Sequence, residues 1–144
     1  MSERHKIKFK PCLRKQPFVS LWVLLNFLLF VSNSFALPTG ISVESGQATI
    51  DDSQQNKLTI QATDRAILKF DSFSIGPNET VQFVQPSANA SVLGRVTGLS
   101  GSEIFGSLFA NGEFVLVNPN GIHFAPSANI QVGSLIASTL SVGR

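Results

Sequence analysis

The amino-acid sequence predicts an all-β fold, and three observations favour a β-solenoid over a sandwich or a barrel. Charged residues make up only 14% of the 144 residues, which suits strands covered on both edges by neighbouring coils. Strand-like alternation continues through residues 130–142, as expected of a solenoid cut between two coils. Asparagine also recurs where turns are expected, so that side-chain amides can stack from coil to coil: Asn78, Asn111, Asn118, Asn120 and Asn129.

The first 36 residues have the order of a secretory signal peptide. A basic segment precedes the apolar run of residues 18–31, which is shorter than the ~20 apolar residues that a membrane span needs. Ser34 and Ala36 place small residues at positions −3 and −1 of a cleavage between Ala36 and Leu37. We therefore expect residues 1–36 to be a signal peptide and residues 37–144 to be the mature chain.

Removal of this leader changes the character of the chain. The leader holds six of the 11 basic residues and one of the nine acidic ones, so five basic and eight acidic residues remain. The remaining basic residues do not cluster, which argues against a nucleic-acid-binding surface. The single cysteine, Cys12, lies in the leader. The mature chain can therefore form neither a disulfide scaffold nor a cysteine-ligated metal site.

The mature chain reads as short strands, because apolar and polar residues alternate with period 2 and no long window keeps the helical period of 3.6. Leu68 and Phe70 are expected on one face of a strand and Lys69 on the other. Residues 114–117 are apolar on both faces, as in a strand buried on both sides. The expected strands lie within residues 58–60, 67–70, 81–83, 114–117, 122–124 and 130–132.

Turn residues separate these segments. Asn111-Gly112 predicts a hairpin between Phe109 and Phe114, because both turn positions tolerate positive φ. The run Asn118-Pro119-Asn120-Gly121 predicts a tight turn, with further turns at residues 76–78 and 125–129. Phe70 to Phe83 is 13 residues and Phe114 to Phe124 is 10, so spacing alone defines no repeat unit.

Several segments, in order, resemble the amino-terminal domain of filamentous haemagglutinin-like proteins, which is the two-partner secretion (TPS) domain. The most specific match is Ala110-Asn111-Gly112 followed by the sequence of residues 117–124. The family domain usually continues beyond this length, so the chain is expected to be incomplete at its end. The other matching segments are residues 37–40, 46–50, 71–76, 81–86, 95–98 and 104–108.

The resemblance implies a right-handed parallel β-helix with a capping β-hairpin layer. It also implies a non-enzymatic secretion domain of an adhesin- or haemagglutinin-like exoprotein, without a cofactor or a metal. The implied partner is an outer-membrane TpsB-type transporter with periplasmic POTRA modules, and a host-cell receptor or surface glycan is a further one. The protein would pass through the periplasm of a Gram-negative-type bacterium to the cell surface or the medium.

Folding outside the cell supplies a driving force for such export. No ATP is available at an outer membrane, whereas stability that accumulates coil by coil can draw an unfolded chain outward. Slow non-local strand pairing would keep the chain extended before export. An extended segment such as residues 114–117 could then add as a strand to a sheet edge of the transporter.

Two readings of the turn residues stay open. Asn118, Pro119, Asn120 and Gly121, together with Asn111 and Gly112, are either recognised by the transporter or are ordinary turn residues of the solenoid. A variant that folds in vitro but is not exported would identify the recognition role.

Other candidate residues point to weaker hypotheses. Asp51, Asp52 and Asp71 could bind Ca²⁺ or cleave glycans, but Glu44 and Asp64 are not spaced as their partners, and residues 51–56 read better as a solvated turn. His123 is expected on the surface, and Arg95 is expected to pair with an acid that the sequence does not identify. The alternative functions are a secreted β-helical polysaccharide-active enzyme and a truncated remnant without function.

Overall fold

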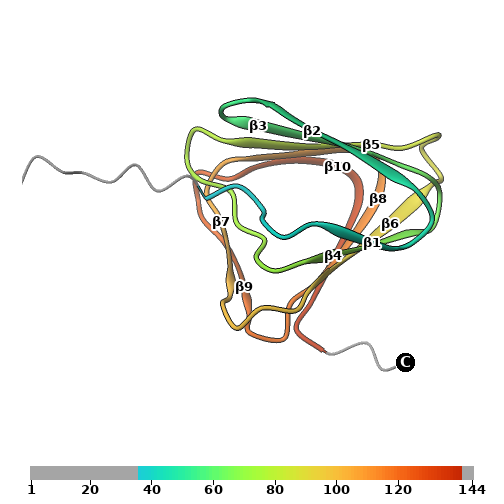
Figure 1. Ribbon diagram of the computed structural model, residues 1–144. Helices are drawn as coiled ribbons and strands as arrows, with labels where there is room; N and C mark the ends of the chain where they lie inside the picture. Colours follow the sequence, from blue (N-terminus) through green and yellow to red (C-terminus); the bar gives the residue numbers. More distant parts are fainter. Residues whose placement is uncertain (1–35, 141–144) are drawn as a thin grey trace, which may run out of the picture. The chain divides into compact units, whose positions relative to one another are not determined.

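A computed structural model describes residues 36–140, which form ten β-strands and no helix. The predicted leader through residue 35 lies outside the described residues, as do residues 141–144. The strands surround a core on three sides (Figure 1), and the all-β prediction is confirmed. The strands are β1 (Ser42–Ser45), β2 (Ala48–Gln54), β3 (Lys57–Ala62), β4 (Ala66–Phe70), β5 (Thr80–Val84), β6 (Ser91–Val96), β7 (Ser102–Ile104), β8 (Ser107–Val117), β9 (Ile122–Phe124) and β10 (Asn129–Ser138).

The strands wind as a parallel solenoid, as expected, and the solenoid has about four coils. On the first side, β3, β5, the first half of β8 and the first half of β10 pair in parallel. On the second side, β4, β6 and the second halves of β8 and β10 do the same. On the third side, β7 pairs with β9, and Ile75 forms a parallel bridge with Ile104.

Corners of unequal length explain why residue spacing defines no exact repeat. The stacked residues Lys57, Thr80, Ser107 and Asn129 are separated by 23 (57 to 80), 27 (80 to 107) and 22 (107 to 129) residues. The strands keep their register, so most of the variation arises where the first side meets the second. That corner consists of residues 63–65, 85–90, 111–112 and 133 in successive coils.

Two antiparallel strands cap the first coil. β2 forms a hairpin with β3 through Gln55 and Asn56, and β1 pairs antiparallel with β4. Both strands lie at the ends of the sheet order, and their side chains are mostly exposed. The cap therefore occupies the strand edges that the first coil would otherwise present to solvent.

Four phenylalanine side chains form the centre of the core. Phe70, Phe73, Phe83 and Phe114 are each exposed by no more than 1%. Phe83 and Phe114 stack with ring centroids 4.2 Å apart, and Phe70 and Phe73 meet edge to face at 5.1 Å. Gly94 leaves room for this cluster, because a Cβ there would approach the rings of Phe70 and Phe114 to 3.2 Å.

The hairpin predicted at Asn111-Gly112 is wrong. β8 continues through both residues and turns from the first side to the second. Gly112 is required for a different reason than positive φ: a Cβ there would lie 2.5 Å from the Ala90 carbonyl oxygen. The hairpin signal therefore marks a corner where two coils come into close contact.

The solvated turn predicted for residues 51–56 is only partly correct. All six residues are exposed, but Asp51 to Gln54 belong to β2 and only Gln55 and Asn56 form the turn. The strand was missed because its side chains face solvent, and it therefore lacks the apolar alternation that marks a strand with one buried face.

Candidate functional site

The turn formed by Asn118, Pro119, Asn120 and Gly121 connects β8 to β9. Asn118 is completely buried, at 0% exposure, whereas Pro119 and Asn120 are exposed. Asn118 Oδ1 accepts a hydrogen bond from the Asn120 backbone N–H at 3.0 Å, and the Asn118 carbonyl accepts one from Gly121 at 3.1 Å. Asn118 thus closes its own turn, as asparagine side chains commonly do.

Asn118 also connects its coil to the two neighbouring coils. Its Nδ2 donates to the Ser102 hydroxyl at 2.9 Å and to the Ser100 carbonyl at 3.1 Å. Its backbone N–H donates to the Ser138 carbonyl at 3.0 Å. Because Ser102 is only 1% exposed, its hydroxyl depends on a protein partner rather than on solvent.

The other polar groups of the turn are more accessible. Asn120 Nδ2 donates to the Gly98 carbonyl at 2.8 Å from an exposed position. Gly121 has φ +109°, a conformation that favours glycine, and no atom lies within 4 Å of the position of a Cβ. In the folded domain, a partner can therefore reach Pro119 and Asn120 but not the side chain of Asn118.

A second amide pair fixes the corner at Asn111 and Gly112. Asn111 Oδ1 accepts from the Gln85 backbone N–H at 2.7 Å, and Asn111 Nδ2 donates to the Gln85 carbonyl at 2.8 Å. The Gln85 side chain, at 5% exposure, accepts from Gly112 N–H at 2.8 Å and donates to the Glu113 carbonyl at 2.8 Å. Sequence reasoning did not identify Gln85 as a residue that fixes this corner. The available signal was its position directly after an alternating strand, where a side-chain amide can bond to the backbone of the next coil.

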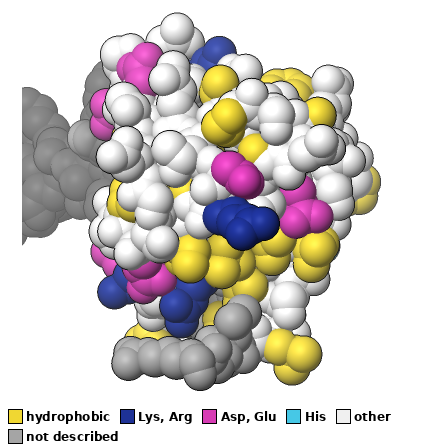
Figure 2. All heavy atoms as spheres, turned by 90° about the vertical axis from the view of Figure 1, so that its right-hand side faces the viewer, with side chains coloured by type: hydrophobic (Ala, Val, Ile, Leu, Met, Phe, Trp, Pro, Cys, Tyr) yellow, Lys and Arg dark blue, Asp and Glu magenta, His cyan; other side chains and the backbone are white. Residues whose placement is uncertain are grey.

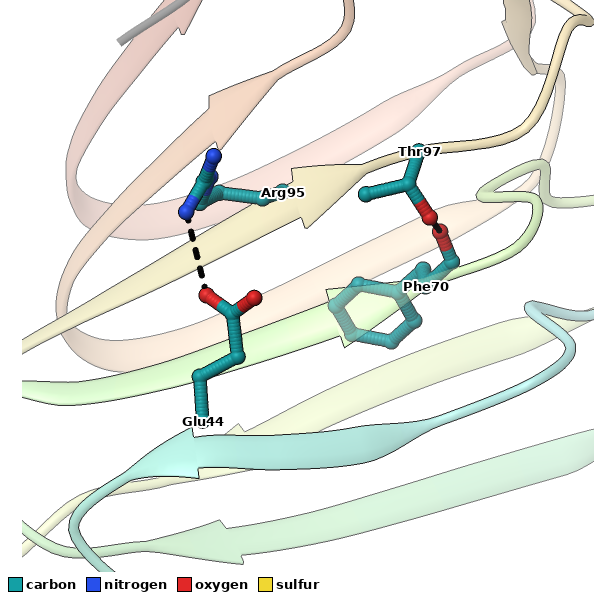
Figure 3. Close-up of polar contacts among 4 residues, drawn as sticks. All are labelled: Glu44, Phe70, Arg95 and Thr97. Atoms are coloured by element: carbon teal, nitrogen blue, oxygen red, sulfur yellow. Dashed lines mark hydrogen bonds and ion pairs between the residues drawn. The ribbon is translucent and has the colours of Figure 1, made fainter. Parts of the chain in front are cut away.

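The unidentified partner of Arg95 is Glu44. Arg95 Nη1 lies 3.1 Å from Glu44 Oε2, with side-chain exposures of 32% and 36% (Figure 3). The pair connects β6 to the capping strand β1 across β4. Figure 3 also shows Thr97, whose hydroxyl donates to the Phe70 carbonyl at 3.3 Å.

The candidate acidic residues do not form a metal site. Within residues 36–140, no three His, Cys, Asp or Glu side chains come together in a way that could hold a metal ion. Asp51 Oδ1 instead accepts a hydrogen bond from the Ser53 backbone N–H at 3.0 Å. The hydrogen bonds from the side chain and backbone of Ser53 lower the pKa of Asp51 from its usual value of 3.8.

His123 is exposed, as predicted, and its ring lies 6.5 Å from that of Phe105. At the predicted cleavage site, Leu37 contacts the core and the Ala36 N–H donates to the Glu79 carboxylate at 3.0 Å. The apolar run of residues 18–31 lies outside the described residues. No helix long and apolar enough to cross a membrane occurs in the part of the chain that the structure describes.

The comparison with protein families covers the whole described region. The TPS secretion domain matches residues 34–142. The chain belongs to this family. A solved structure, the HMW1 secretion domain from Haemophilus influenzae, is similar with a TM-score of 0.71 and 38% identity over 74% of this chain and 28% of that one. The resemblance expected from the ordered segments is therefore confirmed.

Two curated relatives of this TPS secretion domain are heme/hemopexin-binding proteins of Haemophilus influenzae. One, from strain Rd, is 43% identical over 109 residues, which are 75% of this chain and 12% of that protein. The second is 40% identical over 100 residues, which are 69% of this chain and 11% of that protein. The chain thus corresponds to only about a tenth of the length of these relatives.

The surface of the TPS secretion domain is weakly charged. On the face drawn in Figure 2, basic side chains are few and lie mainly beside acidic ones, among uncharged and apolar side chains. The described residues include Lys57, Arg65, Lys69 and Arg95 as their only Lys and Arg residues. This face therefore offers no extended basic patch of the kind that binds nucleic acid.

Proposed function

We propose that this TPS secretion domain directs the export of a two-partner secretion exoprotein through an outer-membrane transporter with POTRA modules. The observation that supports the proposal is the family match over residues 34–142, which coincides with the capped parallel solenoid. In this proposal residues 1–36 are a signal peptide that is cleaved before Leu37, and the mature chain reaches the cell surface or the medium.

Stepwise folding is the proposed source of the driving force. Each coil presents strand edges on which the next coil can pair, so free energy is gained as successive coils form. The cap prevents another coil from pairing with the outer edges of β3 and β4, because β2 and β1 already occupy these edges. Folding would therefore extend from the capped coil toward the coil that emerges after it.

The burial of Asn118 supports a folding role for this residue. Its side chain is inaccessible in the folded domain and is hydrogen-bonded to Ser100 and Ser102. A transporter could read it only while the chain is unfolded. Pro119 and Asn120 are the exposed candidates for recognition in a folded or partly folded state.

Strand addition to the transporter would also require an unfolded segment. Residues 113–117 of β8 pair with β6 on one edge and β10 on the other, so both edges are occupied in the described structure. A complex in which these residues extend a transporter sheet would form before this coil closes. We propose that release of the segment from the transporter and its pairing with β6 occur together.

The proposed role is an export and adhesion module rather than an enzyme. Support for adhesion or ligand capture by the exoprotein comes from the two relatives named for heme/hemopexin binding. Because the match covers only a tenth of those proteins, binding activity of that kind would reside largely in sequence outside this domain.

Secretion with and without a transporter tests the proposal. The full chain with its leader is produced in a Gram-negative host, alone or together with a two-partner transporter that has POTRA modules. We expect the chain in the periplasm without the transporter and in the medium with it. A transporter that lacks its POTRA modules is the matched control. Equal amounts in the medium under all three conditions would contradict the proposal.

A further inference from the structure

Glu79 is a buried acidic residue at the corner that leads into β5. It is 6% exposed, and its Oε2 accepts a hydrogen bond from the Gly76 N–H at 2.8 Å. Among residues 36–140, no Lys, Arg or His forms an ion pair with Glu79. Burial of an ionised carboxylate is unfavourable unless it is paired or strongly hydrogen-bonded.

The second group bound to this carboxylate comes from the predicted cleavage site. The Ala36 N–H lies 3.0 Å from Glu79 Oε1 and 3.2 Å from Oε2. The following residue, Leu37, packs against the core. The buried carboxylate therefore lies where the mature chain enters the solenoid, and it faces backbone nitrogen rather than a side chain.

Cleavage at this point would create a cation beside Glu79, which has no cationic side-chain partner among the described residues. Hydrolysis of the Ala36–Leu37 peptide bond adds one water, so that Ala36 leaves as a carboxylate with the leader. The Leu37 nitrogen becomes an amine that takes up a proton, since an α-amino group has a pKa of about 7.7–8.0. Departure of Ala36 vacates the position that its N–H occupies beside the carboxylate.

We propose that Glu79 binds the α-ammonium group that cleavage after Ala36 leaves on Leu37. The inference depends on the proposed signal peptide. Within residues 36–140, the groups that donate to the carboxylate before cleavage are the neutral backbone N–H groups of Ala36 and Gly76. Afterwards the carboxylate forms a charged hydrogen bond, which is stronger than a neutral one. Removal of the leader would then stabilise the folded domain in addition to separating it from the signal peptide.

The pKa of the α-amine distinguishes two roles for Glu79. In one, its carboxylate pairs with the α-ammonium group of Leu37; in the other, it only accepts the Gly76 N–H within its own turn. The protein is produced with its leader in a Gram-negative host and purified after processing. Mass spectrometry identifies the first residue, and competitive acetylation across pH measures the pKa of the α-amine on the amino-terminal peptide. We expect the chain to begin at Leu37, with an α-amine pKa at least one unit above the ordinary value of about 8.

The variant Glu79→Gln keeps a hydrogen-bond acceptor but removes the charge, so the α-amine pKa should return to about 8. Glu103→Gln makes the same change at an exposed carboxylate and should leave the raised value intact. An ordinary pKa in the unmodified protein overturns the pairing without using any variant, while the proposed function stands if export still requires the transporter. A chain that begins at a residue other than Leu37 overturns both the pairing and the predicted cleavage site.

Discussion

The side-chain amide of Asn118 donates a 2.9 Å hydrogen bond to the hydroxyl of Ser102, and both residues are buried. The two residues are separated by 16 positions in sequence and belong to successive coils. Side-chain bonds of this kind fix how one coil sits on the next, in addition to the backbone ladder between their strands.

Replacement of Asn118 by alanine should destabilise the domain by about 2–3 kcal/mol, because it leaves buried polar groups without a partner. The free energy of unfolding is measured by denaturant titration of the processed protein. Asn120→Ala removes one exposed hydrogen bond in the same turn and should cost less than about 1 kcal/mol. A stable Asn118→Ala protein that fails to be exported would instead support a recognition role.

Gly112→Ala should destabilise the domain by about 2–3 kcal/mol, because the new Cβ would lie 2.5 Å from the Ala90 carbonyl oxygen. Gly121→Ala is the matched comparison: its Cβ meets no atom within 4 Å, and only the φ of +109° opposes it. We expect a cost of about 1–2 kcal/mol at Gly121. Thermal unfolding of both variants would reveal the order, and a reversed order would contradict the crowding at Gly112.

Phe114→Ala should cost about 3–5 kcal/mol, because it removes a fully buried ring from the aromatic cluster. Val115→Ala changes the next residue of β8, which points away from the core and is partly exposed. That substitution should cost about 1 kcal/mol or less. Similar losses in the two proteins, measured by chemical denaturation, would be inconsistent with the observed alternation.

The Glu44–Arg95 pair should contribute only about 0.2–1 kcal/mol, because both side chains are about one-third exposed. A double-mutant cycle with Glu44→Gln and Arg95→Gln measures the coupling energy. The coupling should fall as salt is added, since exposed charges are screened. A coupling that does not change in high salt would indicate that the pair is more enclosed than the structure shows.

Ser53→Ala should raise the pKa of Asp51 toward 3.8, because the Ser53 side chain is the largest cause of its lowering. The folded-state pKa of Asp51 is below its unfolded value. Its contribution to stability is therefore present above about pH 4 and is lost as the pH falls through the folded pKa. Carboxyl resonances followed by NMR against pH would show the change, and an Asp51 pKa that stays the same in Ser53→Ala would contradict the role of Ser53.

Sequence reasoning predicted several of the strands whose side chains alternate between the core and solvent. In β4, for example, Leu68 and Phe70 are fully buried and Lys69 is not, as the pattern indicated. It missed β6, which alternates in the same way. The family resemblance implied a capping hairpin, but the residue pattern did not identify β2 as one of its strands, because β2 faces solvent and is specified by its pairing with β3 rather than by apolar alternation. Its polar residues Asp51 and Asp52 look the same in a strand as in a turn.

The candidate site was only partly predictable for a similar reason. The Asn-Pro-Asn-Gly run marks a turn, but only the fold shows that Asn118 is buried while Asn120, two residues later, is exposed. Glu79 gave no sequence signal, because its contact with Ala36 joins residues that are 43 positions apart. Such contacts depend on how corners of different coils come together, which local patterns do not encode.

The uneven corners also separate what must stay constant from what can vary. Six residues, 85–90, join two strands in one coil where the single residue Gly133 does so in another, yet the strands on either side remain in register. Insertions at the corner between the first and second sides can therefore be accommodated as loops, whereas the strands of the two sides accept almost none. Related domains could thus carry loops of different length and sequence at this corner and still form the same solenoid.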